Sequence, residues 1–311
     1  MSLNNVEMIR DSVSPKPSHI TLPKQGRPFP ELLDFLDEHF PRVGRDVWLE
    51  RLQRGKISDE QGRVLDETTP YRINARLRYF REVKAEPRIP FEEMILFENE
   101  EILVADKPHF LPVTPTGTHV NECLMHRLVV RTGNRELVPV HRLDKETAGL
   151  VLFSKRPETR KAYFGLFEGR RIHKAYEAIA TLPTDRECSE WSVESRIEPS
   201  GEWILCHNVP GRVNARSRIE LLERNGDCAR FSLSPITGKT HQLRLHMGLI
   251  GSQILNDKFY PVLKPESEVV DFSKPLQLLA RGLEFTDPLT GTFYAFESRQ
   301  KLAAWPDGNQ E

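Results

Sequence analysis

The residues best suited to chemistry lie in the sequence HRLD at residues 141–144, directly before the turn-like segment KETAG at 145–149. An apolar run, LVLF at 150–153, follows and is typical of a buried strand. Loops carried on a firm scaffold often hold catalytic groups, so the carboxylate of Asp144 is the first candidate. The nearby guanidinium of Arg142 leaves a simpler alternative, a surface ion pair between these two side chains.

Length and composition limit the kind of protein that carries this segment. With 311 residues, the chain is expected to form one large or two unequal domains. Its 38% hydrophobic and 29% charged residues are typical of a soluble globular protein, and no apolar run approaches the roughly 20 residues that cross a bilayer. The polar N-terminus lacks the apolar core of a secretory signal. We therefore expect a cytoplasmic protein.

The cysteines and histidines do not predict a metal site. The four cysteines form no C-x-x-C pair, which argues against a zinc knuckle and a disulfide framework. They are Cys123, Cys188, Cys206 and Cys228. His241 and His246 are five residues apart, a spacing that does not put two imidazoles on one helical face.

Local charge is more informative than the net charge of −1. Between residues 142 and 174, nine Lys and Arg residues stand against four Asp and Glu residues. A cationic cluster of this kind can bind phosphates, which favours a nucleic-acid partner. The alternative is an ordinary solvated face of a charged helix.

The first part of the chain predicts a flexible leader over residues 1–25 and a small domain over residues 26–86. Apolar spacing predicts a helix in the segment ELLDFLDEHF at 31–40, ended by Pro41. A second helix should turn Trp48 and Leu52 inward, leave Arg51 exposed and stop at Gly55. Short strand-like pieces follow over 56–81, and prolines mark a linker over 84–90.

The remainder, residues 87–311, is expected to form a larger domain that contains both strands and helices. Strands are predicted at 102–105, 174–182 and 231–233, and helices after Pro157 and in the segment THQLRLHMGLIG at 240–251. Alternation along 174–182 puts Lys174, Tyr176, Ala178 and Ala180 on one side of a strand. The fold class is therefore α/β, or more closely α+β.

Four segments of this domain, in this order, resemble the signature of the RluA-type pseudouridine synthases. They are HRLDKETAGLVLFSK from His141, RRIHKAYEA from Arg170, PITGKTHQLRLHM from Pro235 and ILNDKFY from Ile254. The resemblance covers roughly residues 98–300. It implies a mixed, mostly antiparallel sheet with a central RNA-binding cleft, and isomerisation of specific uridines in ribosomal or transfer RNA. It implies no metal and no organic cofactor, and we expect a monomer that acts on RNA.

The resemblance also assigns roles to individual residues. Asp144 falls on the essential aspartate of the family, Tyr176 on its active-site tyrosine, and Arg244 on the arginine that pairs with the aspartate. Arg142 falls where an arginine fills the space left by the extruded nucleotide. The cations expected to contact RNA phosphates are Arg142, Arg170, Arg171, Lys174 and Lys239.

The small domain at 26–86 resembles the RNA-binding domain of the S-four type, through its two short helices, basic edge and small sheet. It departs from that type in the segment SDEQG at 58–62, which replaces the usual asparagine-glycine tip. A small cap that only packs on the main domain is the alternative reading. For the whole chain, the alternatives are an RNA-binding module without catalysis, and an enzyme that cleaves glycosidic bonds with two carboxylates, for which Glu146 or Asp257 would be the second acid.

Overall fold

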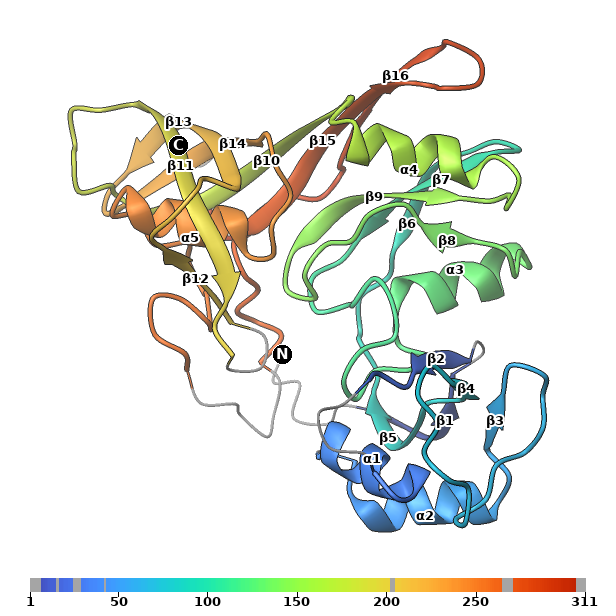
Figure 1. Ribbon diagram of the computed structural model, residues 1–311. Helices are drawn as coiled ribbons and strands as arrows, with labels where there is room; N and C mark the ends of the chain where they lie inside the picture. The colour runs from blue at the N-terminus through green and yellow to red at the C-terminus, as the bar shows by residue number, and fades with distance from the viewer. Residues whose placement is uncertain are drawn as a thin grey trace. The chain divides into compact units, whose positions relative to one another are not determined.

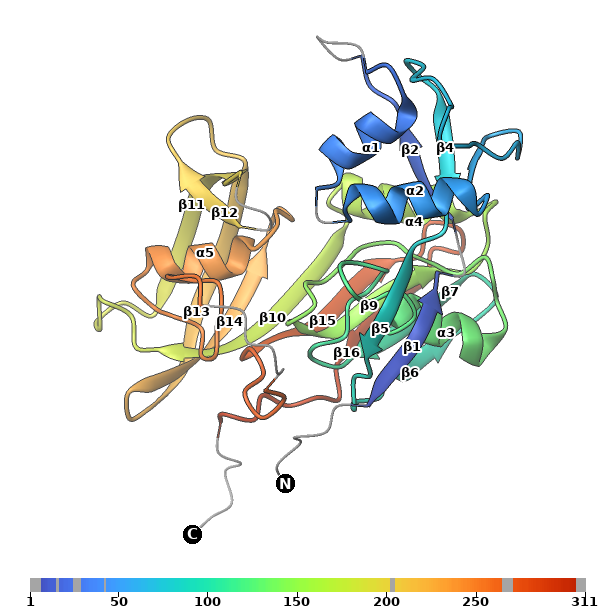
Figure 2. The ribbon, with the colours of Figure 1, turned by 90° about the horizontal axis from the view of Figure 1, so that it is seen from below.

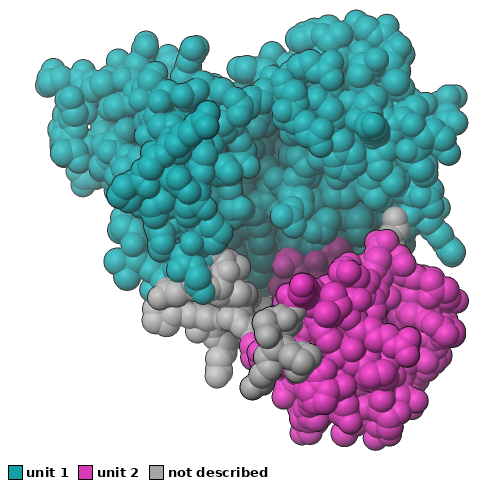
Figure 3. All heavy atoms as spheres, viewed as in Figure 1, with its two compact units in different colours: residues 1–7, 88–114, 122–311 teal, residues 8–87, 115–121 magenta. Residues whose placement is uncertain are grey.

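The computed structural model describes residues 7–14, 17–24, 29–41, 43–201, 205–264 and 271–305. The chain divides into two units, which Figure 3 shows in different colours. Unit 1 comprises residues 1–7, 88–114 and 122–311, and unit 2 comprises residues 8–87 and 115–121.

Unit 1 is built on one sheet of 11 strands (Figure 1). Its strands are β6 (Met94–Glu98), β7 (Ile102–Lys107), β8 (Val138–Pro139), β9 (Ala148–Ser154), β10 (Ile172–Thr181), β11 (Glu190–Pro199), β12 (Cys206–Val209), β13 (Ala215–Asn225), β14 (Cys228–Pro235), β15 (Leu278–Thr286) and β16 (Phe293–Glu297). The order is β12-β11-β13-β14-β10-β15-β9-β7-β6, with β16 beside β15 and β8 beside β9. The pairing of β9 with β15 is parallel and the other printed pairings are antiparallel, so the predicted mixed, mostly antiparallel sheet is confirmed.

Two helices cover opposite faces of strands β7 and β9. Leu103 and Ala105 of β7 pack in one apolar cluster with α3 (Leu124–Thr132), whereas Ile102 and Val104 pack in another with α4 (Arg160–Glu168). Successive side chains of a strand point to opposite faces, so a strand that is apolar at every position must be covered on both. The unbroken run at 150–153 therefore marks a strand that is buried on both faces.

The other half of the sheet is covered by α5 (Gln242–Leu249), which confirms the helix predicted in the segment at 240–251. Leu243, Met247 and Ile250 pack with Ala178 of β10 and Phe231 of β14 in one apolar cluster. Figure 2 shows β10 and β15 running from this half of the sheet to the half that holds β9. These two strands thus fix the α5 half relative to the loop that precedes β9.

Gly149 permits the contact between β9 and β15. Its φ of +114° is one that side chains rarely adopt, and a Cβ atom there would lie 2.3 Å from the carbonyl oxygen of Ala280. Ala280 is also its register partner in the parallel pairing. The glycine at the end of the segment KETAG is therefore required by a close backbone approach, five residues after Asp144.

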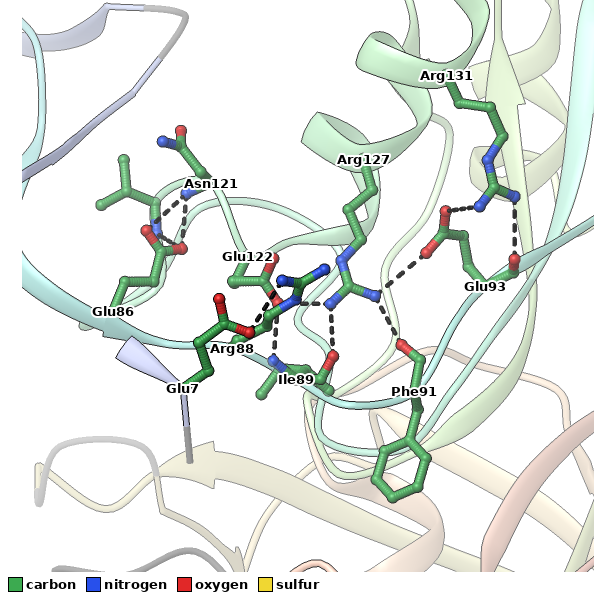
Figure 4. A network of polar contacts seen from close by, with 11 residues as sticks. Glu7, Glu86, Arg88, Ile89, Phe91, Glu93, Asn121, Glu122, Arg127 and Arg131 are labelled. Atoms are coloured by element: carbon green, nitrogen blue, oxygen red, sulfur yellow. Dashed lines mark hydrogen bonds and ion pairs between the residues drawn. The ribbon is translucent and has the colours of Figure 1, made fainter. Parts of the chain in front are cut away.

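Within unit 1, the arginine Arg127 of α3 holds the segment that leads into the sheet (Figure 4). Its guanidinium donates to the carbonyl oxygens of Ile89 at 2.8 Å and Phe91 at 2.7 Å, and it also contacts the carboxylates of Glu93 and Glu122. Because this half-buried guanidinium is bound to two backbone carbonyls and two carboxylates, Arg127 has a structural role.

Unit 2 contains two small sheets and two helices. The strands are β1 (Met8–Val13), β2 (Ser18–Thr21), β3 (Ile57–Asp59), β4 (Arg76–Tyr79) and β5 (Glu82–Pro87), and the helices are α1 (Leu32–His39) and α2 (Arg45–Gln53). Both predicted helices are confirmed, and Trp48 and Leu52 are buried as expected. Segment 115–121 belongs to this unit, where the Glu86 carboxylate accepts hydrogen bonds from the amides of Val120 and Asn121 (Figure 4).

Two expectations for this unit are corrected. Residues 8–13 pair with β5 and residues 18–21 pair with β4, so these parts of the predicted leader are strands; residues 1–6, 15–16 and 25 lie outside the described residues. Their polar composition hid them because edge strands of small sheets need few apolar residues. Arg51 is buried rather than exposed, since its guanidinium lies 4.9 Å from the Trp48 ring centre and donates to the carbonyl of Glu82.

Among the residues described, no helix combines the length and the apolar character that crossing a membrane requires. In the same residues, no group of three or more His, Cys, Asp or Glu side chains could hold a metal ion. Of the four cysteines, Cys123 and Cys206 are buried, and Cys188 and Cys228 are half-buried.

Candidate active site

Asp144 lies in the loop at 141–147, between β8 and β9. Its side chain is 30% exposed, so the carboxylate is accessible, whereas most residues of the loop around it are half-buried. The amide of Thr147 donates to the Asp144 carbonyl at 3.1 Å and closes a turn. A short turn that runs directly into a strand buried on both faces gives Asp144 little freedom to move.

Side chains at and just after the end of β7 form hydrogen bonds with the backbone of this loop. The ammonium of Lys107 is fully buried and donates to three carbonyls, those of Pro108 at 2.9 Å, Leu111 at 2.8 Å and Lys145 at 3.2 Å. Burial lowers the pKa of Lys107 to about 7, against the opposing effect of the Glu146 and Asp144 charges. His109 donates from Nδ1 to the Glu146 carbonyl at 2.7 Å. The backbone on the C-terminal side of Asp144 is therefore fixed by two side chains from one strand end.

His141, the first residue of the segment HRLD, is structural. Its Nε2 accepts a hydrogen bond from the amide of Leu152 at 3.1 Å, and its ring stacks on Phe167 with 4.5 Å between ring centres. Burial, with a further contribution from the Lys174 charge, lowers the pKa of His141 to about 3. A neutral imidazole that accepts from the backbone of β9 fixes the N-terminal side of the Asp144 loop.

Arg244 of α5 reaches Asp144 with only one of its nitrogens. Nη1 lies 3.7 Å from Oδ2 of Asp144. The rest of the guanidinium binds Asp257 in a two-pronged arrangement, with Nε donating to Oδ2 at 2.7 Å and Nη2 donating to Oδ1. The ring of Phe259 lies 4.6 Å from the guanidinium carbon. The sequence predicted an Arg244–Asp144 pair, and the structure adds Asp257 as the tighter partner that orients the arginine.

The carboxylates of Asp144 and Asp257 thus both lie beside the Arg244 guanidinium. Burial alone disfavours its charge, but the hydrogen bonds and the charge of Asp257, with a smaller contribution from Asp144, raise the pKa of Arg244. Nη1 is buried and has no hydrogen-bond partner in the described part of the chain. A buried N–H without a partner is costly, so this nitrogen is available to an anion that moves closer.

His241 is a second group beside Asp144 that the sequence did not single out as a site residue. Its Nε2 lies 3.7 Å from Asp144 Oδ2, and its Nδ1 lies 2.9 Å from the hydroxyl oxygen of Tyr260. Burial lowers the pKa of His241, although the Asp144 charge acts in the opposite direction. The position of His241 three residues before Arg244 was the available signal, since both side chains can project from one helix end.

Tyr176 lies on β10, opposite an irregularity in the pairing with β15 between Ala175 and Glu177. Its other neighbour in the sheet is Leu233 of β14. Burial, with a smaller effect of the Asp144 charge, raises the pKa of Tyr176, which keeps its hydroxyl protonated. The Asp144 charge thus acts on Tyr176 although the two residues are 32 positions apart in the sequence.

The five predicted phosphate-binding cations are not equally placed. Lys174 is half-buried, with Nζ 3.5 Å from the Thr237 carbonyl, and its charge acts on His141. Arg142, within the Asp144 loop, and Lys239, two residues after Thr237, are exposed. Arg170 and Arg171 are exposed at the start of β10, where Arg171 donates weakly to the Gly165 carbonyl at 3.4 Å.

Comparison with known proteins agrees with this geometry. Residues 101–248 match the family described as RNA pseudouridylate synthase. The dual-specificity RNA pseudouridine synthase RluA of Vibrio cholerae is 32% identical over 65% of this chain and 80% of its own length. The protein of that name from Haemophilus influenzae is 30% identical over 66% of this chain and 92% of its own. The human RNA pseudouridylate synthase domain containing protein 4 superposes with a TM-score of 0.52 and 25% identity, over 68% of this chain and 88% of its own.

The sheet, with its parallel β9–β15 pairing and an aspartate loop at that point, has the fold of a pseudouridine synthase. The chain belongs to the RluA-type RNA pseudouridine synthases, which are isomerases that act on RNA. This confirms the resemblance that the four sequence segments predicted.

Proposed function

We propose that this enzyme converts specific uridines of ribosomal or transfer RNA to pseudouridine, with Asp144 as the essential group. The observation that carries the proposal is the state of this carboxylate. It is 30% exposed, lies on a loop held by hydrogen bonds from Lys107, His109 and His141, and has Arg244 Nη1 and His241 Nε2 each 3.7 Å from Oδ2. Asp257, the other acid that contacts Arg244, is instead buried and accepts hydrogen bonds from Arg244 and from the amides of Phe259 and Tyr260.

The reaction breaks the bond between the anomeric carbon of the ribose and N1 of uracil, and forms a bond from the same carbon to C5. The hydrogen on C5 leaves as a proton to solvent, and N1 takes up a proton. Asp144 must be an anion whether it attacks the sugar, attacks the base or removes a proton from the sugar. Tyr176, with its hydroxyl protonated, offers a flat face on which the uracil can stack. No step requires a metal or an organic cofactor.

The uridine must leave its stack before Asp144 can reach it, at a cost of a few kcal/mol. Arg142 is exposed two residues before Asp144, so it can occupy the space that the extruded nucleotide vacates. Lys174, Lys239, Arg170 and Arg171 contact phosphates, which adds affinity without reading the sequence. We expect unit 2 to add a further RNA contact, and the protein to act as a cytoplasmic monomer.

The test is release of tritium from RNA labelled at C5 of uridine. The full-length protein should release tritium from total RNA of cells that lack it, and mapping of pseudouridines in cells with and without the protein should identify the target. An absence of release from every cellular RNA would instead favour a binding module. Free uracil and abasic sites would identify an enzyme that cleaves the glycosidic bond.

A further inference from the structure

His241 has three unusual properties that the proposed reaction does not use. Its backbone is left-handed, with a φ of 56°, although it is not a glycine. Its side chain is buried, and both of its ring nitrogens face a side-chain oxygen, one on Asp144 and one on Tyr260. Strained conformations that persist at a buried position are often retained because the side chain they aim has a function.

Both nitrogen contacts of Asp144 fall on the same oxygen. Arg244 Nη1 and His241 Nε2 each lie 3.7 Å from Oδ2, whereas Oδ1 has no hydrogen bond or ion pair with any residue the structure describes. At this distance the contacts are longer than hydrogen bonds, as is common before a substrate closes a site. The two donors therefore orient the carboxylate and leave Oδ1 for the uridine.

The position of the proton on His241 is coupled to the orientation of the Tyr260 hydroxyl. Its hydroxyl oxygen is within hydrogen-bond distance of the Cys206 amide at 3.0 Å, the Cys206 carbonyl at 2.9 Å and His241 Nδ1 at 2.9 Å. The hydroxyl has one proton, which it can donate either to the Cys206 carbonyl or to Nδ1. Burial raises the pKa of Tyr260 to about 12, so this proton is present at working pH.

The two orientations of the hydroxyl suit two charge states of the imidazole. When the hydroxyl donates to Nδ1, a neutral imidazole must carry its proton on Nε2, toward Asp144. When it donates to the Cys206 carbonyl, Nδ1 must be a donor, and an imidazolium then has a proton on Nε2 as well. The remaining arrangement, a neutral ring protonated on Nδ1, would turn a lone pair toward the Asp144 carboxylate and is disfavoured.

We propose that His241 is a positioning residue, held by the Tyr260 hydroxyl so that its Nε2–H faces Asp144 Oδ2 and leaves Oδ1 free to act on the uridine. This inference rests on the proposed function of Asp144. The charged and titratable groups that face His241 are Asp144 from the loop before β9, Arg244 from α5, and Asp257 and Tyr260 from the segment after α5.

Two substitutions of His241 distinguish the contribution of Nε2, which faces Asp144, from that of Nδ1, which faces Tyr260. Gln places an amide N–H near the position of Nε2 and can still donate to Asp144, whereas Asn reaches only toward Tyr260 and readily accepts the left-handed backbone. We expect His241→Asn to lower kcat by about 10- to 100-fold with KM changed less than about twofold, and His241→Gln to stay within about fivefold of the unsubstituted enzyme. Tritium release from labelled total RNA is the assay, and thermal unfolding verifies folding.

A loss in His241→Gln as large as that in His241→Asn would overturn the proposal, as would full activity of His241→Asn. Full activity of Asp144→Asn would instead refute the proposed function. A measurement independent of turnover is nitrogen-15 NMR of the histidine-labelled full chain at pH 8, with His241→Asn used to assign the signal. We expect the proton on Nε2; a neutral ring protonated on Nδ1 would refute the positioning role even if the enzyme is active.

Discussion

Two acidic loops approach Arg244, and they differ in how completely their carboxylates are satisfied. Asp257, in the segment after α5, is 2% exposed, and it accepts hydrogen bonds from Arg244 and from the amides of Phe259 at 2.8 Å and Tyr260 at 3.1 Å. Asp144, in the loop before β9, is 30% exposed, and among the described residues its carboxylate has only the two 3.7 Å contacts with Arg244 and His241. A carboxylate whose oxygens all accept hydrogen bonds stabilises the fold. A carboxylate with few hydrogen bonds that lies beside a cation can take part in catalysis.

The loops also differ in what supports them. The Asp144 loop is fixed through its backbone by Lys107, His109 and His141, so its side chain does not take part in holding it. In the Asp257 segment, the aspartate itself makes the supporting hydrogen bonds. We therefore expect replacement by asparagine to reduce mainly activity at Asp144 and mainly stability at Asp257.

The largest effect is expected for Asp144→Asn. It removes the charge but keeps the size, so pseudouridine formation should fall at least about 1,000-fold while the urea midpoint of unfolding stays unchanged. Tritium release in single-turnover reactions measures the first quantity. Residual turnover above about a thousandth of the unsubstituted enzyme would exclude Asp144 as the essential group. The exposed Asp227→Asn serves as a matched control that should alter neither property.

Asp257→Asn should mainly reduce stability. It leaves the buried Arg244 guanidinium without its full counter-charge, which should lower the free energy of unfolding by about 3 to 5 kcal/mol. Activity should fall as well, because Arg244 loses its orientation, but less than in Asp144→Asn. Urea unfolding followed by fluorescence tests this expectation. An unchanged urea midpoint would contradict the structural role assigned to Asp257.

Acid should loosen the Asp144 loop before the Asp257 segment. Burial holds the pKa of His141 at about 3 in the folded protein, so its stabilising effect is complete above the unfolded value near 6.5 and is lost as pH falls from there toward 3. Protonation of Nε2 also removes the acceptor for the Leu152 amide. Hydrogen exchange, corrected for its intrinsic pH dependence, should show protection at Leu152 falling before protection at Phe259. Equal losses would contradict this difference.

The smallest effect is expected for Arg142→Ala. This substitution removes an exposed side chain of the Asp144 loop and leaves the hydrogen bonds that hold the loop unchanged. Because Arg142 is proposed to stabilise the extruded state, catalysis should fall about tenfold on structured RNA and about twofold on short single strands. Comparing kcat/KM on the two kinds of labelled RNA measures this. Equal losses would leave Arg142 as a general phosphate contact, and the Glu168→Ala variant provides a control at another exposed position.

Local sequence determined much of this protein. The periodicity of apolar residues located α1, α2, α4, α5, β7 and β10, because the spacing of apolar residues along a segment reflects which of its sides is buried. The segment HRLD before an apolar run placed Asp144 in a loop that leads into a buried strand. Alternation along 174–182 placed Tyr176 on the same side of its strand as Ala178 and Ala180. Polar edge strands such as β1 carried too little apolar signal to be found.

The tertiary structure alone decided which side chains meet. Whether Arg244 binds Asp144, Asp257 or both depends on how α5, the loop before β9 and the segment after α5 pack, and these lie up to about 110 residues apart in the chain. The role of His241 likewise follows from a left-handed backbone that aims its ring between Asp144 and Tyr260. Residue types and spacing specify helices and strands, but distances between loops are fixed only when the sheet brings them together.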